Sequence, residues 1–386
     1  MSKSDENKRR VPKLRFPGFT EDWEQRKVSE LCSISTGKSN TQDKVEDGEY
    51  PFYVRSAIIE RSNKYLYDEE AVLTVGDGVG TGKVFHYVSG KYDLHQRCYR
   101  MYDFTDELNV HYFYHTFSKL FYKRVMAMTA KTSVDSVRLE MIADMEIPCP
   151  KIKEQEKIGQ YLDNLDNLIT LHQRKCDRLK ELKKGLLQKM FPKNGEKIPE
   201  LRFSGFTEDW EQRKFSDFAQ RESLFQMSSY DCPSVEYEDV IAEEGCLNKD
   251  IRLKEVQKTG IKFDGTQVLY GKLRPYLHNW LNPDFIGVAV GDWWVLRPVE
   301  IDKNFLYRLI QTKKFDNVAN QSSGSKMPRA DWNLVSQSEF IVPISLEEQC
   351  RIAEAFEGLD HLITLHQRKL DHLKELKKGL LQQMFV

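Results

Sequence analysis

The chain has 386 residues, 40% hydrophobic and 30% charged, a composition typical of a globular protein with more than one core. A formal net charge of −1 is low for a protein that binds DNA alone, so basic residues must be clustered or a partner must supply phosphate contacts. The sequence contains no run of about 18 apolar residues, so it predicts no membrane-spanning helix.

The N-terminus and the cysteines indicate a cytoplasmic protein. Residues 1–10 are polar and charged, without the apolar stretch of a secretion signal, and we expect a flexible basic arm there. The seven cysteines are scattered and form no CxxC pair. This pattern favours free thiols in a reducing cytosol over a disulfide framework or a zinc site.

The first predicted globular region mixes strands with a helix. Residues 50–59 and 71–75 have the β-branched and aromatic character of strands, and residues 110–128 have helical character. The turn at residues 75–83 has the sequence VGDGVGTGK. It is not a P-loop, because Asp77 stands where Gly is required. Either the backbone of this turn approaches a phosphate, or it is a plain hairpin turn.

Basic residues interleaved with aromatic and hydrogen-bonding side chains make this region a candidate for DNA contact. Arg and Lys suit guanine, Asn and Gln suit adenine, and Ser, Thr and loop amides suit phosphates. The candidate DNA-binding residues are Gly76, Gly78, Lys83, Gln96, Arg97, Arg100, Lys131, Thr132 and Ser133. The alternative for each of them is an ordinary surface or core role.

Residues 153–192 predict a long helix, because apolar residues recur at steps of three and four without an internal proline. At ~1.5 Å per residue, a helix of this size spans roughly 55 Å. Residues 347–386 repeat the pattern, and two such stripes related by a two-fold axis would pack antiparallel. The expected core positions are Ile158, Leu165, His172, Leu179, Leu186, Ile352, Leu359, His366, Leu373 and Leu380. The two histidines either form a buried pair that fixes the register or lie at the margin of the stripe.

The second globular region has its own strands and basic clusters. Residues 267–273, 285–290 and 293–296 predict strands, and residues 303–314 predict a helix. Residues 282–285, NPDF, only faintly resemble the NPPF/Y motif of amino-methyltransferases, and a turn is the simpler interpretation. The candidate DNA-binding residues here are Lys272, Arg274, Tyr276, Asn279, Ser325, Lys326 and Arg329.

An internal duplication organises the whole chain. Residues 11–27 return as residues 198–214 with 14 of 17 positions identical, and residues 165–191 return as residues 359–385 with 23 of 27 identical. The inserts between these frames do not visibly match. Neutral drift would erode frames and inserts alike, so the contrast favours inserts that were exchanged or selected for different targets.

These frames resemble the specificity subunits of type I restriction-modification systems. The resemblance rests on Leu14-Arg15-Phe16-Pro17-Gly18-Phe19…Trp23 and its copy at residues 201–210, and on Glu154-Gln155-x-x-Ile158 and its copy Glu348-Gln349-x-x-Ile352. It covers nearly the whole chain. It implies an α+β fold with two target-recognition domains, each recognising half of a bipartite DNA site, and a pair of long antiparallel helices that sets their separation.

The resemblance also implies partners. We expect double-stranded DNA, methyltransferase subunits in two copies that carry S-adenosylmethionine and methylate adenine, and restriction/translocase subunits that use ATP and Mg. For this chain itself we expect no catalytic centre, cofactor or metal. The alternatives are a solitary DNA methyltransferase or nuclease, and a coiled-coil scaffold whose globular regions bind proteins.

The predicted organisation has five parts. They are a basic arm at residues 1–10, a first target-recognition domain at 11–152, a spacer helix at 153–192, a second target-recognition domain at 193–346 and a second spacer helix at 347–386.

Overall fold

The computed structural model describes residues 12–78, 80–128, 136–193, 195–254, 256–321 and 327–385. The chain divides into two compact units. Unit 1 comprises Met1–Gln173 and Arg368–Val386, and unit 2 comprises Arg174–Gln367. Each unit therefore contains one insert and about half of each long helix. The predicted basic arm at residues 1–10 lies outside the described residues.

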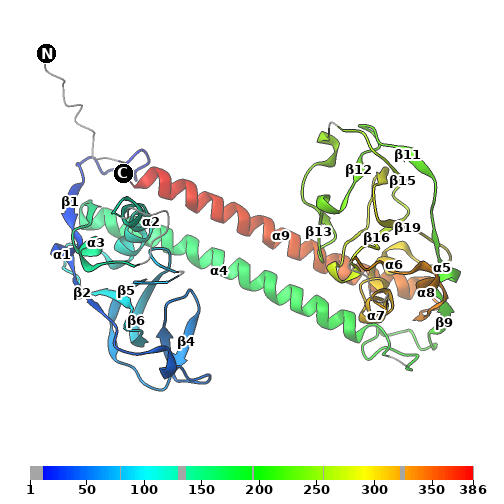
Figure 1. The fold of residues 1–386 in the computed structure, drawn as a ribbon, viewed down its shortest axis with the longest axis horizontal. Coiled ribbons are helices and arrows are strands. Elements are labelled where there is room, and N and C mark those ends of the chain that lie inside the picture. The colour runs from blue at the N-terminus through cyan, green and yellow to red at the C-terminus, as the bar shows by residue number, and fades with distance from the viewer. Residues whose placement is uncertain are drawn as a thin grey trace, which may run out of the picture. The chain divides into compact units, whose positions relative to one another are not determined.

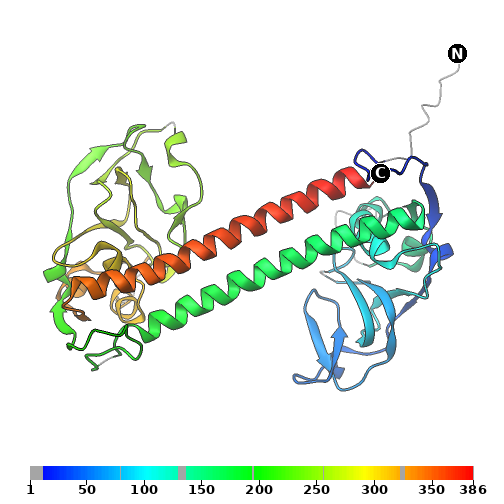
Figure 2. The same ribbon diagram turned by 180° about the vertical axis from the view of Figure 1, so that it is seen from behind.

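Two long helices, α4 (Ile152–Lys189) and α9 (Leu346–Met384), run without a break, as the sequence pattern predicts (Figures 1 and 2). They have 38 and 39 residues. Helix α4 ends just before Pro192, a residue that cannot continue a helix without losing a backbone hydrogen bond. Of the ten expected core positions, Ile158, Leu165, His172, Ile352 and Leu373 are buried, and Leu179, Leu186, Leu359, His366 and Leu380 are half-buried.

Unit 1 is built on a six-stranded sheet in the order β2-β7-β5-β6-β3-β4. Its elements are β1 (Glu24–Lys27), α1 (Val28–Leu31), β2 (Ser33–Thr36), the 3-10 turn η1 (Thr41–Asp43), β3 (Tyr50–Tyr53), β4 (Ile59–Ser62), β5 (Tyr67–Val75), β6 (Phe85–Leu94), β7 (Cys98–Tyr102), α2 (Val110–Met128), α3 (Leu139–Ala143) and β8 (Glu146–Cys149). Strands β1 and β8 form a separate antiparallel pair.

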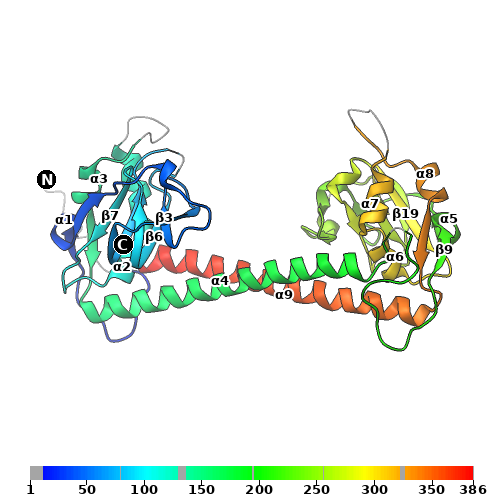
Figure 3. The ribbon, with the colours of Figure 1, turned by 90° about the horizontal axis from the view of Figure 1, so that it is seen from below.

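Helix α2 occupies the predicted residues and packs between the sheet of unit 1 and α4 (Figure 3). Its aromatic face, with Phe113 and Phe117, shares one core with Met101 of β7 and Ile158 of α4. The strand predicted at residues 50–59 is shorter, because the chain turns after Tyr53 and returns as β4.

Unit 2 contains two four-stranded sheets, in the orders β10-β19-β16-β17 and β11-β15-β18-β12. Its elements are β9 (Glu211–Lys214), α5 (Phe215–Phe218), β10 (Ala219–Arg221), β11 (Phe225–Met227), β12 (Ser234–Val235), η2 (Tyr237–Asp239), β13 (Val240–Ile241), β14 (Cys246–Leu247), η3 (Ile251–Leu253), β15 (Thr259–Phe263), β16 (Val268–Gly271), η4 (Pro275–Leu277), β17 (Trp280–Leu281), β18 (Gly287–Ala289), β19 (Trp293–Pro298), α6 (Lys303–Leu309), α7 (Lys313–Ala319), α8 (Trp332–Gln337) and β20 (Glu339–Val342).

The single helix predicted at residues 303–314 is wrong, because the segment contains the break between α6 and α7. Thr312 lies between these two helices in an extended conformation, and its hydroxyl accepts a hydrogen bond from the Phe315 amide at 3.3 Å. A side chain that caps a helix N-terminus in this way starts a new helix.

The two inserts share one scaffold although their sequences do not visibly match. The order β2-β7-β5-β6 in unit 1 is repeated as β10-β19-β16-β17 in unit 2, and the β1–β8 pair is repeated as β9–β20. In both units a glutamine of the long helix accepts a hydrogen bond from a backbone amide of the insert: Gln155 from Asn109 at 2.9 Å, and Gln349 from Asp302 at 2.7 Å. The predicted α+β fold with an internal repeat is confirmed.

Each long helix begins in one unit and ends in the core of the other. Met190 and Phe191, just after α4, are buried in the core of unit 2, where the Phe191 ring stacks on Phe305. Met384 and Phe385, at the end of α9, are buried in the core of unit 1. Both ends therefore act as hydrophobic anchors.

Ion pairs add polar contacts between the two long helices and, in unit 2, between a long helix and the insert. In unit 2, Asp360 of α9 pairs with Arg308 at 2.6 Å and with Lys183 of α4 at 2.7 Å. The side chain of Arg308 is only 2% exposed. In unit 1, Asp166 of α4 pairs with Lys377 of α9 at 2.5 Å. Among the helices of the described ranges, none has a stretch long and apolar enough to span a lipid bilayer.

Candidate nucleic-acid interface

Each unit has a loop at the end of its central strand that is held by the same backbone hydrogen bonds. In unit 1, the Gly76 amide donates to Arg97 O at 2.8 Å, and the Val137 amide donates to Gly76 O at 2.7 Å. In unit 2, the Lys272 amide donates to Asp292 O at 2.9 Å, and the Ala330 amide donates to Lys272 O at 2.8 Å. We call these two arrangements the loop frames.

Corresponding positions of the loop frames carry different side chains. Gly76 in unit 1 corresponds to Lys272 in unit 2, and Arg97 corresponds to Asp292. A backbone bridge joins Asp77 to Ser136 in unit 1, and the corresponding bridge joins Leu273 to Arg329 in unit 2. The backbone is thus repeated while the charge at each position is not, so the two units present different chemistry from one scaffold.

In unit 2, one carboxylate at the loop frame lies close to two basic side chains. The Nε and Nη2 atoms of Arg329 donate to the two oxygens of Asp292 at 3.2 and 3.0 Å, and Lys272 Nζ lies 3.5 Å from the same carboxylate. Hydrogen bonds from Arg329 lower the pKa of Asp292, so this group is ionised at neutral pH. The Arg329 side chain is 51% exposed, which leaves it accessible to a ligand.

A half-buried tyrosine fixes the backbone at this cluster. The Tyr237 hydroxyl donates to Asp292 O at 2.5 Å and accepts from the Leu273 amide at 2.9 Å. Its ring packs edge-on against Trp293. Next to the cluster, Arg274 has a left-handed backbone conformation with φ 49°, and its amide donates to Pro328 O at 2.7 Å. The unit 2 loop frame is therefore rigid rather than an adaptable surface loop.

In unit 1, a carboxylate at a different position of the loop frame lies between two arginines. Asp77 pairs with Arg55 at 3.4 Å and with Arg97 at 3.2 Å, and both arginine side chains are about half exposed or more. Beside them, the Gln96 amide donates to the side-chain oxygen of Asn40 at 2.5 Å. This group of arginines and amides has the donors and acceptors that base edges require.

The structure brings together only some of the predicted DNA-binding residues. Exposed ones at or near the loop frames are Gly78, Gln96, Arg97, Arg274, Tyr276 and Arg329, with Lys272 half-buried. Lys83 is exposed, with its Nζ 4.9 Å from the centre of the Tyr122 ring. Lys131, Thr132, Ser133, Ser325 and Lys326 lie outside the described residues.

Three of the predicted residues are packed against, or hydrogen-bonded to, other parts of the protein. The guanidinium of Arg100 lies over the ring of Tyr102, 3.6 Å from its centre, and hydrogen-bonds Glu69 and Ser35. Gly76 and Asn279 are buried. Their contact with DNA stays a prediction.

Sequence reasoning missed Arg55, Asn40, Asp77 and Asp292 as members of these clusters. Asp77 had been considered only as a residue that breaks a P-loop pattern. Its partners lie some 20 residues away on neighbouring segments, so no local spacing rule could have paired them. The sequence does indicate Arg97, Arg274 and Arg329, because a basic residue in an aromatic, strand-rich segment is a recognisable signal.

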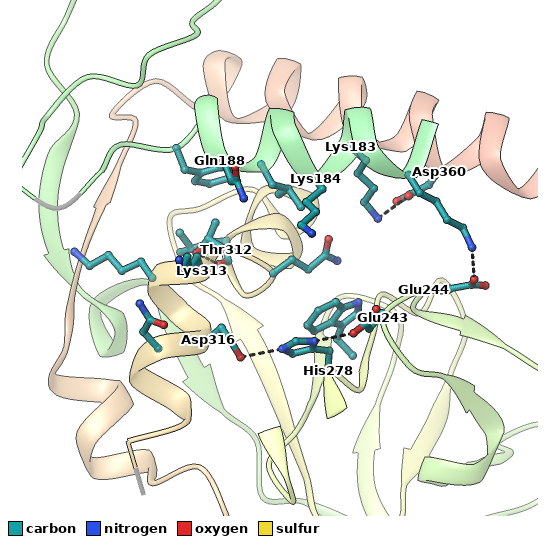
Figure 4. A pocket seen from close by; sticks show the side chains of 18 of the residues that line it. Lys183, Lys184, Gln188, Glu243, Glu244, His278, Thr312, Lys313, Asp316 and Asp360 are labelled. Atoms are coloured by element: carbon teal, nitrogen blue, oxygen red, sulfur yellow. Dashed lines mark hydrogen bonds and ion pairs between the residues drawn. The ribbon is translucent and has the colours of Figure 1, made fainter. Parts of the chain in front are cut away.

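Unit 2 also contains a cleft of about 1250 Å³, lined by α4, α7 and the loop around His278 (Figure 4). Several of its charged groups are paired with one another. His278 lies between Asp316, at 3.0 Å, and Glu243, at 3.3 Å, and Lys183 pairs with Asp360 (Figure 4). Within the described ranges, no group of three or more His, Cys, Asp or Glu side chains is placed to hold a metal ion.

The comparisons with known proteins identify the family. Residues 20–181 and 207–375 both match the model of the type I restriction modification DNA specificity domain. The two matches cover most of the chain, and they contain both loop frames. The chain therefore belongs to the family of type I restriction-modification DNA specificity proteins.

Individual relatives are distant but extend over most of the chain. The MjaVIII specificity subunit of a type I restriction enzyme from Methanocaldococcus jannaschii is 23% identical and covers 99% of this chain and 96% of its own length. The EcoDI specificity subunit from Escherichia coli is 24% identical and covers 88% of this chain and 81% of its own length. The crystal structure of a type I restriction-modification S subunit from M. genitalium has the same fold, with a TM-score of 0.73 at 14% identity over 97% of this chain and 99% of that chain.

Proposed function

We propose that this chain is the DNA-specificity subunit of a type I restriction-modification complex, and that each unit recognises one half of a bipartite site. The observation that carries the proposal is the pair of loop frames: one hydrogen-bonded backbone, repeated, with different side chains. A duplicated scaffold whose two copies carry different side chains at equivalent positions suits a protein that recognises two different sequences.

The chain acts in this proposal without chemistry of its own. Its partners are double-stranded DNA, methyltransferase subunits that carry S-adenosylmethionine, and restriction/translocase subunits that use ATP and Mg. This division of labour is supported by the net charge of −1, because a chain with no excess of cations needs help to hold the DNA backbone. The solitary-enzyme and protein-scaffold alternatives are not favoured by the family match.

The long helices set the gap between the half-sites in this proposal. Both helices contribute core residues to unit 1 and to unit 2, so a change in their length must change the distance that the chain imposes. Phosphate contacts position each unit, and base contacts specify the sequence.

The test is to insert seven residues after Gln173 and seven after Gln367, which are matched positions of the repeat. One heptad keeps the apolar stripe in phase and adds ~10 Å at ~1.5 Å per residue. We expect both half-sites to be kept and the gap to grow by about three base pairs, since bases are stacked at ~3.4 Å. Sequencing of methylated DNA measures this. A recognised gap of unchanged length in an active, folded variant contradicts the proposal that the helices set it.

A further inference from the structure

One edge of the Arg329 guanidinium is paired with a carboxylate, and the other edge of this half-exposed side chain has no polar partner among the described residues. A guanidinium has five N–H donors arranged along two usable edges. Asp292 takes the edge formed by Nε and Nη2. The remaining edge, formed by Nη1 and the second hydrogen of Nη2, makes no hydrogen bond or ion pair within the part of the chain that the structure describes. Arg329 thus offers a pair of parallel donors on a side chain that is 51% exposed.

These donors are held in position before any ligand arrives. A bidentate pair with Asp292 restricts the rotation of the arginine side chain. The Asp292 backbone is itself fixed, because its carbonyl oxygen accepts from both the Tyr237 hydroxyl and the Lys272 amide. A rigid donor pair loses little conformational entropy on binding and tolerates few alternative partners.

We propose that Arg329 is the specificity-determining residue of unit 2 and recognises one guanine of its half-site, with Asp292 as the positioning residue. The inference rests on the proposed function and adds the base and the side chain. In the major groove, guanine presents two adjacent acceptors, O6 and N7, which match the free edge of Arg329. Adenine offers one acceptor beside a donor, and thymine offers one acceptor beside a methyl group, so neither satisfies both donors.

The unit 1 loop frame does not carry the same inference. Arg97 forms an ion pair with Asp77 through Nη1, and Arg55 shares the same carboxylate. Neither arginine is held along a whole edge, so their orientation toward a base is less defined. Ser136, which corresponds to Arg329, has no comparable donors. Recognition of a guanine through a held arginine is thus assigned to unit 2 alone.

A phosphate is the other group of DNA whose acceptors could meet this edge, and the two cases predict different results. A phosphate contact positions the protein without sequence information. Losing it weakens binding to all sequences alike and reduces the dependence of affinity on salt. Losing a guanine contact relaxes a single position of the site.

The experiment compares methylated sites across a genome in cells that express the complex with wild-type chain, Arg329→Ala, Arg329→Lys or Asp292→Asn. For Arg329→Ala we expect the preference for guanine to fall roughly tenfold to a hundredfold at one position of one half-site. The other half-site should stay unchanged. Arg329→Lys keeps the charge but lacks the two parallel donors, and we expect a loss at the same position. Asp292→Asn should weaken the same preference less.

Arg297→Ala is the matched control. Arg297 is also 51% exposed and paired with a half-buried carboxylate, Glu222, but it lies on β19 away from the loop frame. Its loss should leave the motif unchanged. The inference is overturned if Arg329→Lys keeps the full guanine preference, or if Arg329→Ala lowers methylation of all sites equally. Failure of the wild-type complex to produce any two-part motif would instead refute the proposed function.

Discussion

At the scale of single residues, the polar contacts of this protein differ in what they stabilise. Arg308 is almost fully buried and depends on Asp360 for its counter-charge. Arg329 is half exposed, and its pair with Asp292 orients donors at the surface. An exposed pair contributes little to stability, whereas breaking a buried pair leaves a charge without compensation.

Asp360→Asn should destabilise unit 2 by about 3 kcal/mol, because the buried Arg308 then keeps its charge without its nearest carboxylate. Denaturant unfolding of the purified chain measures the effect. Glu347→Gln is the control, since Glu347 pairs with Arg351 at the surface and should change stability by no more than about 0.5 kcal/mol. Equal stability of the two variants would mean that the Arg308–Asp360 pair does not hold α9 to the insert.

The Asp292 pair should stabilise the protein at neutral pH and lose its effect only in acid. Hydrogen bonds from Arg329 lower the folded-state pKa of Asp292 below its unfolded value, near 3.9. The contribution is therefore fully present above about pH 5 and disappears as pH falls through the lowered pKa. The stability difference between wild type and Asp292→Asn, at most about 1 kcal/mol, should stay constant from pH 5 to 8. A difference that changes within that range would contradict this assignment.

At the scale of elements, the long helices are stabilised at their ends as well as along their stripes. Phe191 lies in the core of unit 2 and Phe385 in the core of unit 1. Phe191→Ala and Phe385→Ala should each cost about 3 kcal/mol, because a large buried ring leaves a cavity. Leu182→Ala is the control, as Leu182 is 49% exposed in α4. Thermal unfolding measures all three, and a loss no larger than that of the control would show that the helix ends are not anchored.

The sequence predicts these elements unevenly, for physical reasons. The long helices and α2 are marked by apolar residues that recur every three or four positions. This pattern is local in the sequence, so it predicts all three helices well. The break between α6 and α7 was missed because the sequence does not distinguish a threonine inside a helix from one that caps a helix N-terminus. The loop frames were missed because they join residues such as Gly76, Arg97 and Val137, which are far apart in the chain and linked by backbone atoms.

Side-chain chemistry alone also could not separate surface arginines from structural ones. Arg97 and Arg100 are near neighbours with the same functional group. Arg100 lies across the sheet, between aromatic rings and Glu69, while Arg97 is exposed beside Asp77. Arg97 lies in the turn before β7, whereas the strand register places residue 100 opposite Ser35.

At the scale of the whole molecule, the chain is one scaffold used twice, with a charge close to zero. A net charge of −1 gives the isolated chain little attraction for the DNA backbone. We expect it to bind random DNA weakly, with an affinity that depends only slightly on salt. Addition of the methyltransferase subunits should increase both the affinity and its salt dependence, because they add phosphate contacts. Fluorescence anisotropy at several salt concentrations measures this, and equal salt slopes would contradict the division of labour.

The central claim is that two unlike surfaces on one repeated scaffold recognise two half-sites. The most direct measurement is a map of methylated adenines in a genome that carries this chain and its partner subunits. We predict one motif in two parts, with different sequences in the two halves and a gap of constant length. A single uninterrupted motif, two halves with a variable gap, or methylation without sequence preference would contradict the account.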